Sequence, residues 1–280
     1  MSIEQTQNHE IKSLSKRRRE ELRRHWNGVM VDPFAFTPHE ERERGLTVEK
    51  AEEENRKLGM FAADFLKQVI TYLGRKNTRQ ERLARSAKVV DVGSGKNHAS
   101  HWLDAAVEAG LGTLSIDVSD IACGIAESDL RVQWDNISSP KESHQAPIVR
   151  QGEIQTILAE PESIELDTES VEIWYFCRLL GCLSEASARA VLQEVGWVSL
   201  SEGADPEGKR AVVIVNAFKD DNQNITSKTS ILRSKESVLR HLSVGAGREV
   251  KVVHHISHEE TYKYFAKTVS AMTIMANTQL

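Results

Sequence analysis

Apolar residues recur every three or four positions in the first part of the chain, a spacing that predicts amphipathic helices. One long helix is predicted from Thr47, a suitable N-cap, to Leu73, with Gly74 at its end. A highly charged helix is predicted over 9–26, after a polar start that is expected to be disordered. A short basic helix is predicted over 78–86. Roughly the first 85 residues are therefore expected to be helical.

Beyond residue 86, short β-branched and apolar runs alternate with helical patterns. Such runs are typical of buried parallel strands. The alternation predicts an α/β fold. The predicted strands are 88–92, 113–116, 154–158, 170–178, 211–216, 249–253 and one within 266–275, the predicted helices between them are 99–109, 121–126, 186–195 and 234–242, and 127–150 is expected to be irregular.

Composition limits the function classes. The chain has 280 residues, 40% of them hydrophobic and 28% charged, which suits one α/β domain with an extension. A net charge of -5 argues against a dedicated nucleic-acid binder. The N-terminus has no apolar run, so neither a secretory signal nor a membrane span is expected. Cys123, Cys177 and Cys182 lack metal-ligand spacing, and we expect free thiols in a reducing cytoplasm.

Two glycines end the first predicted strand abruptly, in the segment Asp91-Val92-Gly93-Ser94-Gly95. Glycine lets the backbone bend and approach a ligand without a Cβ in the way. The free N–H groups of the next helix face the same space. A strand, a glycine turn and a helix in this order predict a nucleotide-type pocket.

Two phosphate-binding motifs fit this segment poorly. A P-loop needs glycine at position 90 and Ser or Thr after the lysine, but the chain has Val90 and Asn97. A dinucleotide fingerprint needs glycine at position 98, which is His98. A tight turn that binds no ligand remains the structural alternative.

Two carboxylates change the expected ligand. Asp91 in the turn would repel a pyrophosphate but suits an amino group or ribose hydroxyls. Asp117 ends the second predicted strand, where a carboxylate can accept from both ribose hydroxyls. Asp91-Val92-Gly93-Ser94-Gly95 followed by Asp117 resembles the signature of class I S-adenosylmethionine-dependent methyltransferases.

The resemblance implies a doubly wound α/β fold: a seven-stranded, mostly parallel sheet with helices on both faces and an antiparallel last strand. It implies a methyltransferase domain over 86–280, with 1–85 as a helical N-terminal cap. The implied cofactor is S-adenosylmethionine, and the product is S-adenosylhomocysteine. Asp117 would hold the ribose, and Glu160 would accept from the adenine amino group unless it is a loop residue. The implied cofactor-binding residues are Asp91, Gly93, Ser94, Gly95, Asp117, Val118, Glu160, Phe176 and Cys177.

The segment 170–183 matches the fourth strand of the family at Glu172, Arg178 and Leu180, but Gly181 stands where many relatives have histidine. No catalytic base is therefore assigned. The candidate bases are His98, His101, His254 and His255, none with the third ligand that a metal site needs, and the candidate acceptor-binding residues are Phe34, Phe36, Arg178 and Asn216.

The acceptor class stays open. The acidic chain favours methyl transfer to O or N of a small molecule, by a monomer or homodimer that binds neither nucleic acid nor membrane. The basic stretch Lys16–Arg24 keeps RNA or protein methylation as an alternative. Gly181 keeps a third possibility, a non-catalytic partner that binds the cofactor for stability.

Overall fold

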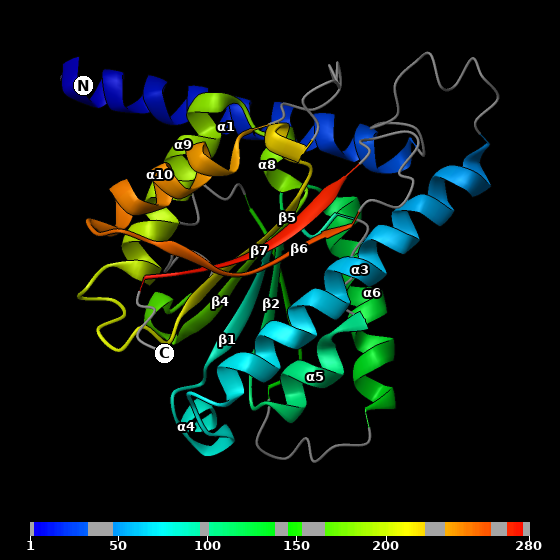
Figure 1. The fold of residues 1–280 in the computed structure, drawn as a ribbon. Coiled ribbons are helices and arrows are strands. Elements are labelled where there is room, and N and C mark those ends of the chain that lie inside the picture. Colours follow the sequence, from blue (N-terminus) through cyan, green and yellow to red (C-terminus); the bar gives the residue numbers. More distant parts are fainter. Residues whose placement is uncertain are drawn as a thin grey trace.

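The centre of the protein is a seven-stranded sheet with strand order β3-β2-β1-β4-β5-β7-β6. This computed structural model describes residues 3–32, 47–95, 101–137, 145–152, 166–221, 233–258 and 268–276, with side chains from Arg17 onward. Neighbouring strands pair in parallel except for β7, which is antiparallel to β5 and β6. The predicted sheet is confirmed (Figure 1). The strands are β1 (Lys88–Val92), β2 (Gly112–Asp117), β3 (Ile148–Gln151), β4 (Val171–Cys177), β5 (Ala211–Asn216), β6 (Lys251–His258) and β7 (Val269–Met275).

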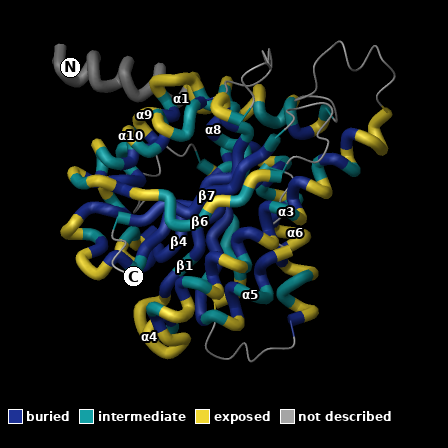
Figure 2. The backbone as a smooth tube through the Cα atoms, viewed as in Figure 1, coloured by how far each residue is buried: buried dark blue, intermediate teal, exposed yellow. Residues whose placement is uncertain are grey.

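Helices cover both faces of the sheet because successive strand residues point to opposite sides. Val89 packs in one apolar cluster with α3 and α5, and Val90 packs in the other with α9 and α10. Both clusters are buried in the centre of the molecule (Figure 2). The α-helices are α1 (Ile3–Val31), α3 (Val48–Gly74), α4 (Arg79–Ala84), α5 (Leu103–Glu108), α6 (Asp120–Asn136), α8 (Leu179–Cys182), α9 (Glu185–Val195) and α10 (Lys235–Ala246). Within the described ranges, no helix has both the length and the apolar character needed to span a membrane.

A buried ion pair fixes α4 to the amino end of β4. Arg82 and Glu172 are 1% and 2% exposed, and an Oε1 of Glu172 lies 2.7 Å from the Arg82 guanidinium. Arg85 contacts the other oxygen at 3.0 Å, and Asn77 donates to it at 3.4 Å. Glu172, which matches the family motif, therefore has a structural role at the end of the sheet opposite the glycine turn.

Several predicted boundaries are wrong. The helix predicted over 121–126 continues to Asn136, because Ala126 and Leu130 extend its buried face into the stretch expected to be irregular. Ile148–Gln151 is a strand that pairs with β2, within the stretch expected to be irregular, whereas the predicted strand 154–158 lies outside the described residues. β6 runs to His258, so the candidate bases His254 and His255 lie within the strand rather than after its predicted end at residue 253. α1 starts at Ile3 in the stretch expected to be disordered, and α5 starts at Leu103 rather than at residue 99.

Candidate cofactor site

The candidate site lies at the carboxyl edge of the parallel strands. β1 lies between β2 and β4, and the chain crosses to opposite faces of the sheet on the two sides of β1. Such a switch point is where open α/β sheets bind ligands. The ends of β1 and β2 bring the glycine turn and Asp117 together here, as the sequence predicts.

Both glycines of the turn have a left-handed backbone conformation. Their φ values are +69° at Gly93 and +58° at Gly95, a region that L-residues with a Cβ rarely adopt. The Gly93 N–H donates to Ile116 O at 2.8 Å, which folds the turn onto β2. A Cβ at Gly93 would lie 2.8 Å from Leu179 Cδ1, so this glycine also allows α8 to pack closely. Ser94 is buried beside it.

Backbone N–H groups hold Asp117 in place. Its Oδ1 accepts from Ser119 N and its Oδ2 accepts from Gly95 N, both at 2.8 Å. Burial raises the pKa of this carboxyl group, and these hydrogen bonds act in the opposite direction. Each carboxylate oxygen can accept a further hydrogen bond, so the geometry suits the hydroxyls of a ribose beside Val118.

Asp91 has a different environment. It is 3% exposed, and burial together with the charge of Asp117 raises its pKa to about 7. It lies beside Tyr175 in the sheet register. A positively charged ligand group would favour the ionised form of Asp91, so the site suits an ammonium group.

The end of β4 carries further candidates. Burial raises the pKa of Cys177 to about 11, so its thiol stays neutral. Phe176 is fully buried on the other face of the sheet. Arg178 has a left-handed backbone with φ 63°, and its Nη1 donates to Asn55 Oδ1 of α3 at 2.7 Å. Its N–H donates to Val215 O, which places Arg178 beside the end of β5, where Asn216 is buried.

Helix α1 also reaches this edge, through residues that carry no signal in the sequence. Figure 1 shows α1 running across the end of the sheet. Ser119 donates its hydroxyl to Asn27 Oδ1 at 2.7 Å, and Arg23 lies 3.7 Å from Asp120. An amide in a charged helical segment gives no sequence signal of its own, so these contacts needed the structure.

The candidate histidines that the structure describes do not form one group. His101 is exposed just before α5. His254 stacks on Phe65 of α3 with 4.8 Å between ring centroids, and His255 Nε2 lies 3.3 Å from Ser257 Oγ. Three strands separate β6 from β1, so the last two histidines are far from the glycine turn. His98, Phe34, Phe36 and Glu160 lie outside the described residues, and Glu160 does not directly follow the third strand, which ends at Gln151.

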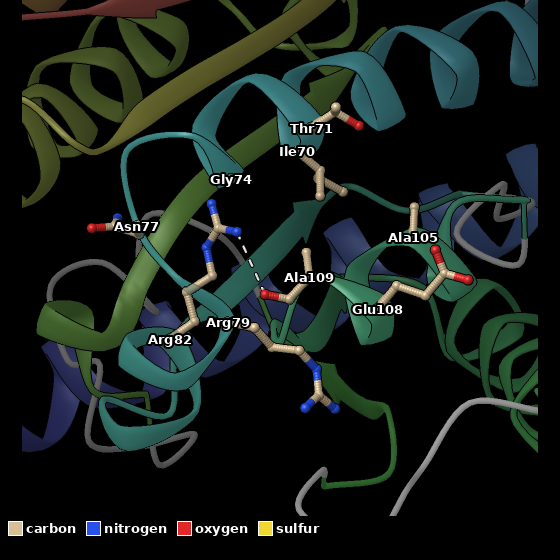
Figure 3. Close-up of a pocket in the computed structure, with 9 residues that line it drawn as sticks. All are labelled: Ile70, Thr71, Gly74, Asn77, Arg79, Arg82, Ala105, Glu108 and Ala109. Atoms are coloured by element: carbon tan, nitrogen blue, oxygen red, sulfur yellow. Dashed lines mark hydrogen bonds between the residues drawn. The ribbon is translucent and has the colours of Figure 1, made fainter.

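A cleft of about 290 Å³ lies elsewhere, between α3, α4 and α5 (Figure 3). Its polar wall includes Arg82, whose Nη1 donates to Ala109 O at 3.4 Å and whose guanidinium pairs with Glu172. That ion pair fixes α4 to the amino end of β4. The cleft is therefore a gap left where α4 packs beside α3 and α5. We do not place the cofactor site there. The cleft is lined by Ile70, Thr71, Gly74, Asn77, Arg79, Arg82, Ala105, Glu108 and Ala109.

No protein-family model matches the sequence, and no curated protein matches it either. Solved structures do match. A geranyl diphosphate C-methyltransferase from Streptomyces coelicolor A3(2), solved with Mg²⁺, geranyl diphosphate and S-adenosylhomocysteine, aligns with a TM-score of 0.53 at 11% identity, over 92% of this chain and 98% of that chain.

Two further structures align less well. They are a S-adenosylmethionine-dependent methyltransferase from Aquifex aeolicus (TM-score 0.44, 16% identity, 75% of this chain and 98% of that chain) and an arsenic(III) methyltransferase from Chlamydomonas reinhardtii (0.46, 11%, 69% and 64%). Our assignment rests on the Streptomyces structure together with the strand order. The chain therefore has the class I S-adenosylmethionine-dependent methyltransferase fold.

Proposed function

We propose that this protein is an S-adenosylmethionine-dependent methyltransferase that acts on an O or N nucleophile of a small molecule. The observation that carries the proposal is the meeting of two unlike carboxylates at the switch point. Asp117 is held by backbone N–H groups and suits ribose hydroxyls, and Asp91 is buried with a raised pKa and suits a cationic amino acid group.

The cofactor would lie along the carboxyl edge. Asp117 and Val118 would contact its ribose, and Glu160 stays the proposed partner of the adenine amino group. The left-handed glycine turn would pass its methionine part, whose ammonium would face Asp91. The residues proposed to bind the cofactor remain Asp91, Gly93, Ser94, Gly95, Asp117, Val118, Glu160, Phe176 and Cys177.

The sulfonium supplies an already activated methyl group. The protein then has to align the acceptor nucleophile with the methyl group and exclude water. α1 lies across the carboxyl edge and α3 is bonded to Arg178 at the end of β4, so both helices are placed to enclose that edge. We therefore propose 1–85 as the cap and 86–280 as the cofactor domain.

For the acceptor we propose contacts with Arg178 and Asn216, and with Phe34 and Phe36 from outside the described residues. The Streptomyces protein, a geranyl diphosphate C-methyltransferase, supports the small-molecule class but does not identify the acceptor here. The described thiols are all free, which fits the proposed reducing cytoplasm. We assign no catalytic base, and we propose a monomer or homodimer.

Calorimetric titration with S-adenosylmethionine and S-adenosylhomocysteine tests the proposal. We expect micromolar binding, about 8 kcal/mol, by the wild type. Asp117→Asn should weaken it at least about tenfold, because a carboxylate hydrogen bond is worth about 1.5–3 kcal/mol. Asp104→Asn is the matched control, since Asp104 is a surface residue paired with Lys67. A folded wild type that gives no heat and no thermal shift with either ligand would rule out the proposal.

The RNA alternative predicts a separate behaviour. Arg17, Arg18 and Arg19 are exposed on α1, so RNA binding through them would weaken steeply with salt and on their neutralisation. We expect the triple alanine variant to bind the cofactor as the wild type does.

A further inference from the structure

We propose that Asn27 of α1 is a positioning residue of the cofactor site, which acts on the ribose-binding carboxylate Asp117 through Ser119. This inference rests on the proposed function. It makes α1 part of the cofactor site rather than an appended surface helix, in keeping with its course across the end of the sheet in Figure 1.

The contacts form a short chain. Ser119 is fully buried and donates its hydroxyl to Asn27 Oδ1 at 2.7 Å. The same hydroxyl accepts from Ala122 N at 3.2 Å, as the N-cap of α6. The backbone N–H of Ser119 donates to Asp117 Oδ1 at 2.8 Å. The side chain of Asn27 therefore satisfies a buried donor in the residue whose backbone orients Asp117.

Asp120 provides a second connection between the same elements. Its carboxylate accepts from Asn27 Nδ2 at 3.4 Å and lies 3.7 Å from Arg23 of α1. On the other side it accepts from Gln151 Nε2, and the Gln151 amide also donates to Val118 O at 3.3 Å. α1 and the end of β3 thus hold the β2–α6 turn from two sides. Val118 and Ser119, the two residues that follow Asp117, are both bonded from outside β2.

An apolar stripe fixes α1 in this place. Leu22, Trp26 and Met30 are spaced four residues apart, so they lie on one side of the helix. Met30 is buried, and Leu22 and Trp26 are half-buried. Arg24 is exposed, and its Nε bonds within α1 to Glu20 O. Removal of the Asn27 amide is therefore expected to leave α1 docked while it releases Ser119. Arg24 offers a control substitution on the same helix.

The test is a thermodynamic cycle that combines substitution of Asn27 with removal of the 2′-hydroxyl from the ribose of the ligand. S-adenosylhomocysteine and its 2′-deoxy analogue are titrated calorimetrically into the wild type, Asn27→Ala and Arg24→Ala. We expect loss of the 2′-hydroxyl to weaken binding to the wild type about tenfold or more, as for a hydrogen bond to a charged group. Asn27→Ala should bind S-adenosylhomocysteine about five- to tenfold more weakly, and its penalty for the deoxy analogue should fall to about twofold. Arg24→Ala should match the wild type in both.

A merely structural role for Asn27 gives a different result. It would lower affinity for both ligands by the same factor and leave the deoxy penalty at its wild-type value, which would overturn the inference. Unchanged affinity of Asn27→Ala would overturn it as well. Gln151→Ala gives a second measurement from the β3 side, where the penalty should also fall. If the wild type binds neither ligand, the proposed function fails, whereas binding with an unchanged penalty refutes only the role of Asn27.

Discussion

Asp91 in β1 and Asp117 at the end of β2 show how two identical functional groups acquire different properties at one edge of the sheet. Asp117 accepts two backbone hydrogen bonds, which stabilise its charge. Asp91 is buried beside that charge, and its pKa is raised to about 7. The sequence predicts both positions from the motif, but it cannot predict the difference, because the burial of Asp91 depends on packing of α3 and α5 over its face of the sheet.

The raised pKa of Asp91 predicts a pH-dependent affinity for S-adenosylmethionine. The cationic cofactor favours ionised Asp91, so the dissociation constant should fall as pH rises through about 7, by up to about tenfold per unit below that pKa. Calorimetry at pH 6, 7 and 8 measures the slope. Asp91→Asn should bind the cofactor more weakly and show little dependence of the dissociation constant on pH. Asp104→Asn should show the same pH dependence as the wild type. An equal slope in Asp91→Asn would show that another group titrates.

Stability without ligand should change in the opposite direction. The folded-state pKa of Asp91 lies above its ordinary value of 3.8, so the protonated form is favoured by folding. The contribution of this group is fully present below pH 3.8 and is lost as pH rises towards 7. In urea titrations over this range, the free energy of unfolding of the wild type should decline as pH rises. Asp91→Asn should lack this decline.

The glycine turn gives a matched pair of substitutions. Gly93→Ala and Gly95→Ala both place a Cβ on a left-handed residue, which costs about 1–2 kcal/mol. Only at Gly93 does the Cβ also meet Leu179, at 2.8 Å, against 3.9 Å to the nearest atom at Gly95. Gly93→Ala should therefore lose more unfolding free energy in urea titrations. Equal losses would mean that α8 moves away at little cost.

At the scale of elements, the best predictions concern segments whose pattern is local. β5 consists of five apolar residues and Asn216, and it lies at the predicted positions. α3 starts after the predicted N-cap Thr47, whose Oγ1 accepts from Lys50 N. β3 at Ile148–Gln151 is not predicted by the sequence, for a physical reason. It has four half-buried or exposed residues at the edge of the sheet, and its existence depends on pairing Ile148 with Leu114, a contact distant in sequence.

Two glycines test helix packing. Gly124 lies inside α6, where a Cβ would meet nothing within 4 Å, so Gly124→Ala should stabilise the protein by about 0.5–1 kcal/mol. Gly245 lies against α9, where a Cβ would lie 1.9 Å from Gln193 O, so Gly245→Ala should destabilise it by about 1–3 kcal/mol or more. Urea titrations measure both. Unchanged or increased stability of Gly245→Ala would contradict the close crossing of α9 and α10.

The buried pair between α4 and β4 predicts a large loss. Glu172→Ala leaves the buried Arg82 guanidinium without its carboxylate, which typically costs about 3–5 kcal/mol. Glu53→Ala is the control, because Glu53 pairs with Arg56 on the surface and should change stability little. A small loss for Glu172→Ala in urea titrations would show that water replaces the carboxylate.

At the scale of the whole molecule, the sequence predicts the layers of the fold because each strand and helix carries its own pattern. The resemblance adds the number of strands and the antiparallel last strand. The site is harder to predict, because it is assembled from segments that lie far apart along the chain. Asn27 of α1 and Asn55 of α3 reach the edge through the helices that carry them. Their positions depend on docking over the completed sheet, and a polar residue on a charged helix does not indicate that partner.

The most direct test of the central claim is a crystal structure of the protein with S-adenosylhomocysteine. The account predicts that the ribose hydroxyls lie within about 3 Å of the Asp117 carboxylate. It predicts the ribose beside Val118 and the ammonium group beside Asp91, with α1 in place over the β2–α6 turn. A ligand bound away from the glycine turn, such as in the cleft between α3, α4 and α5, would contradict the account.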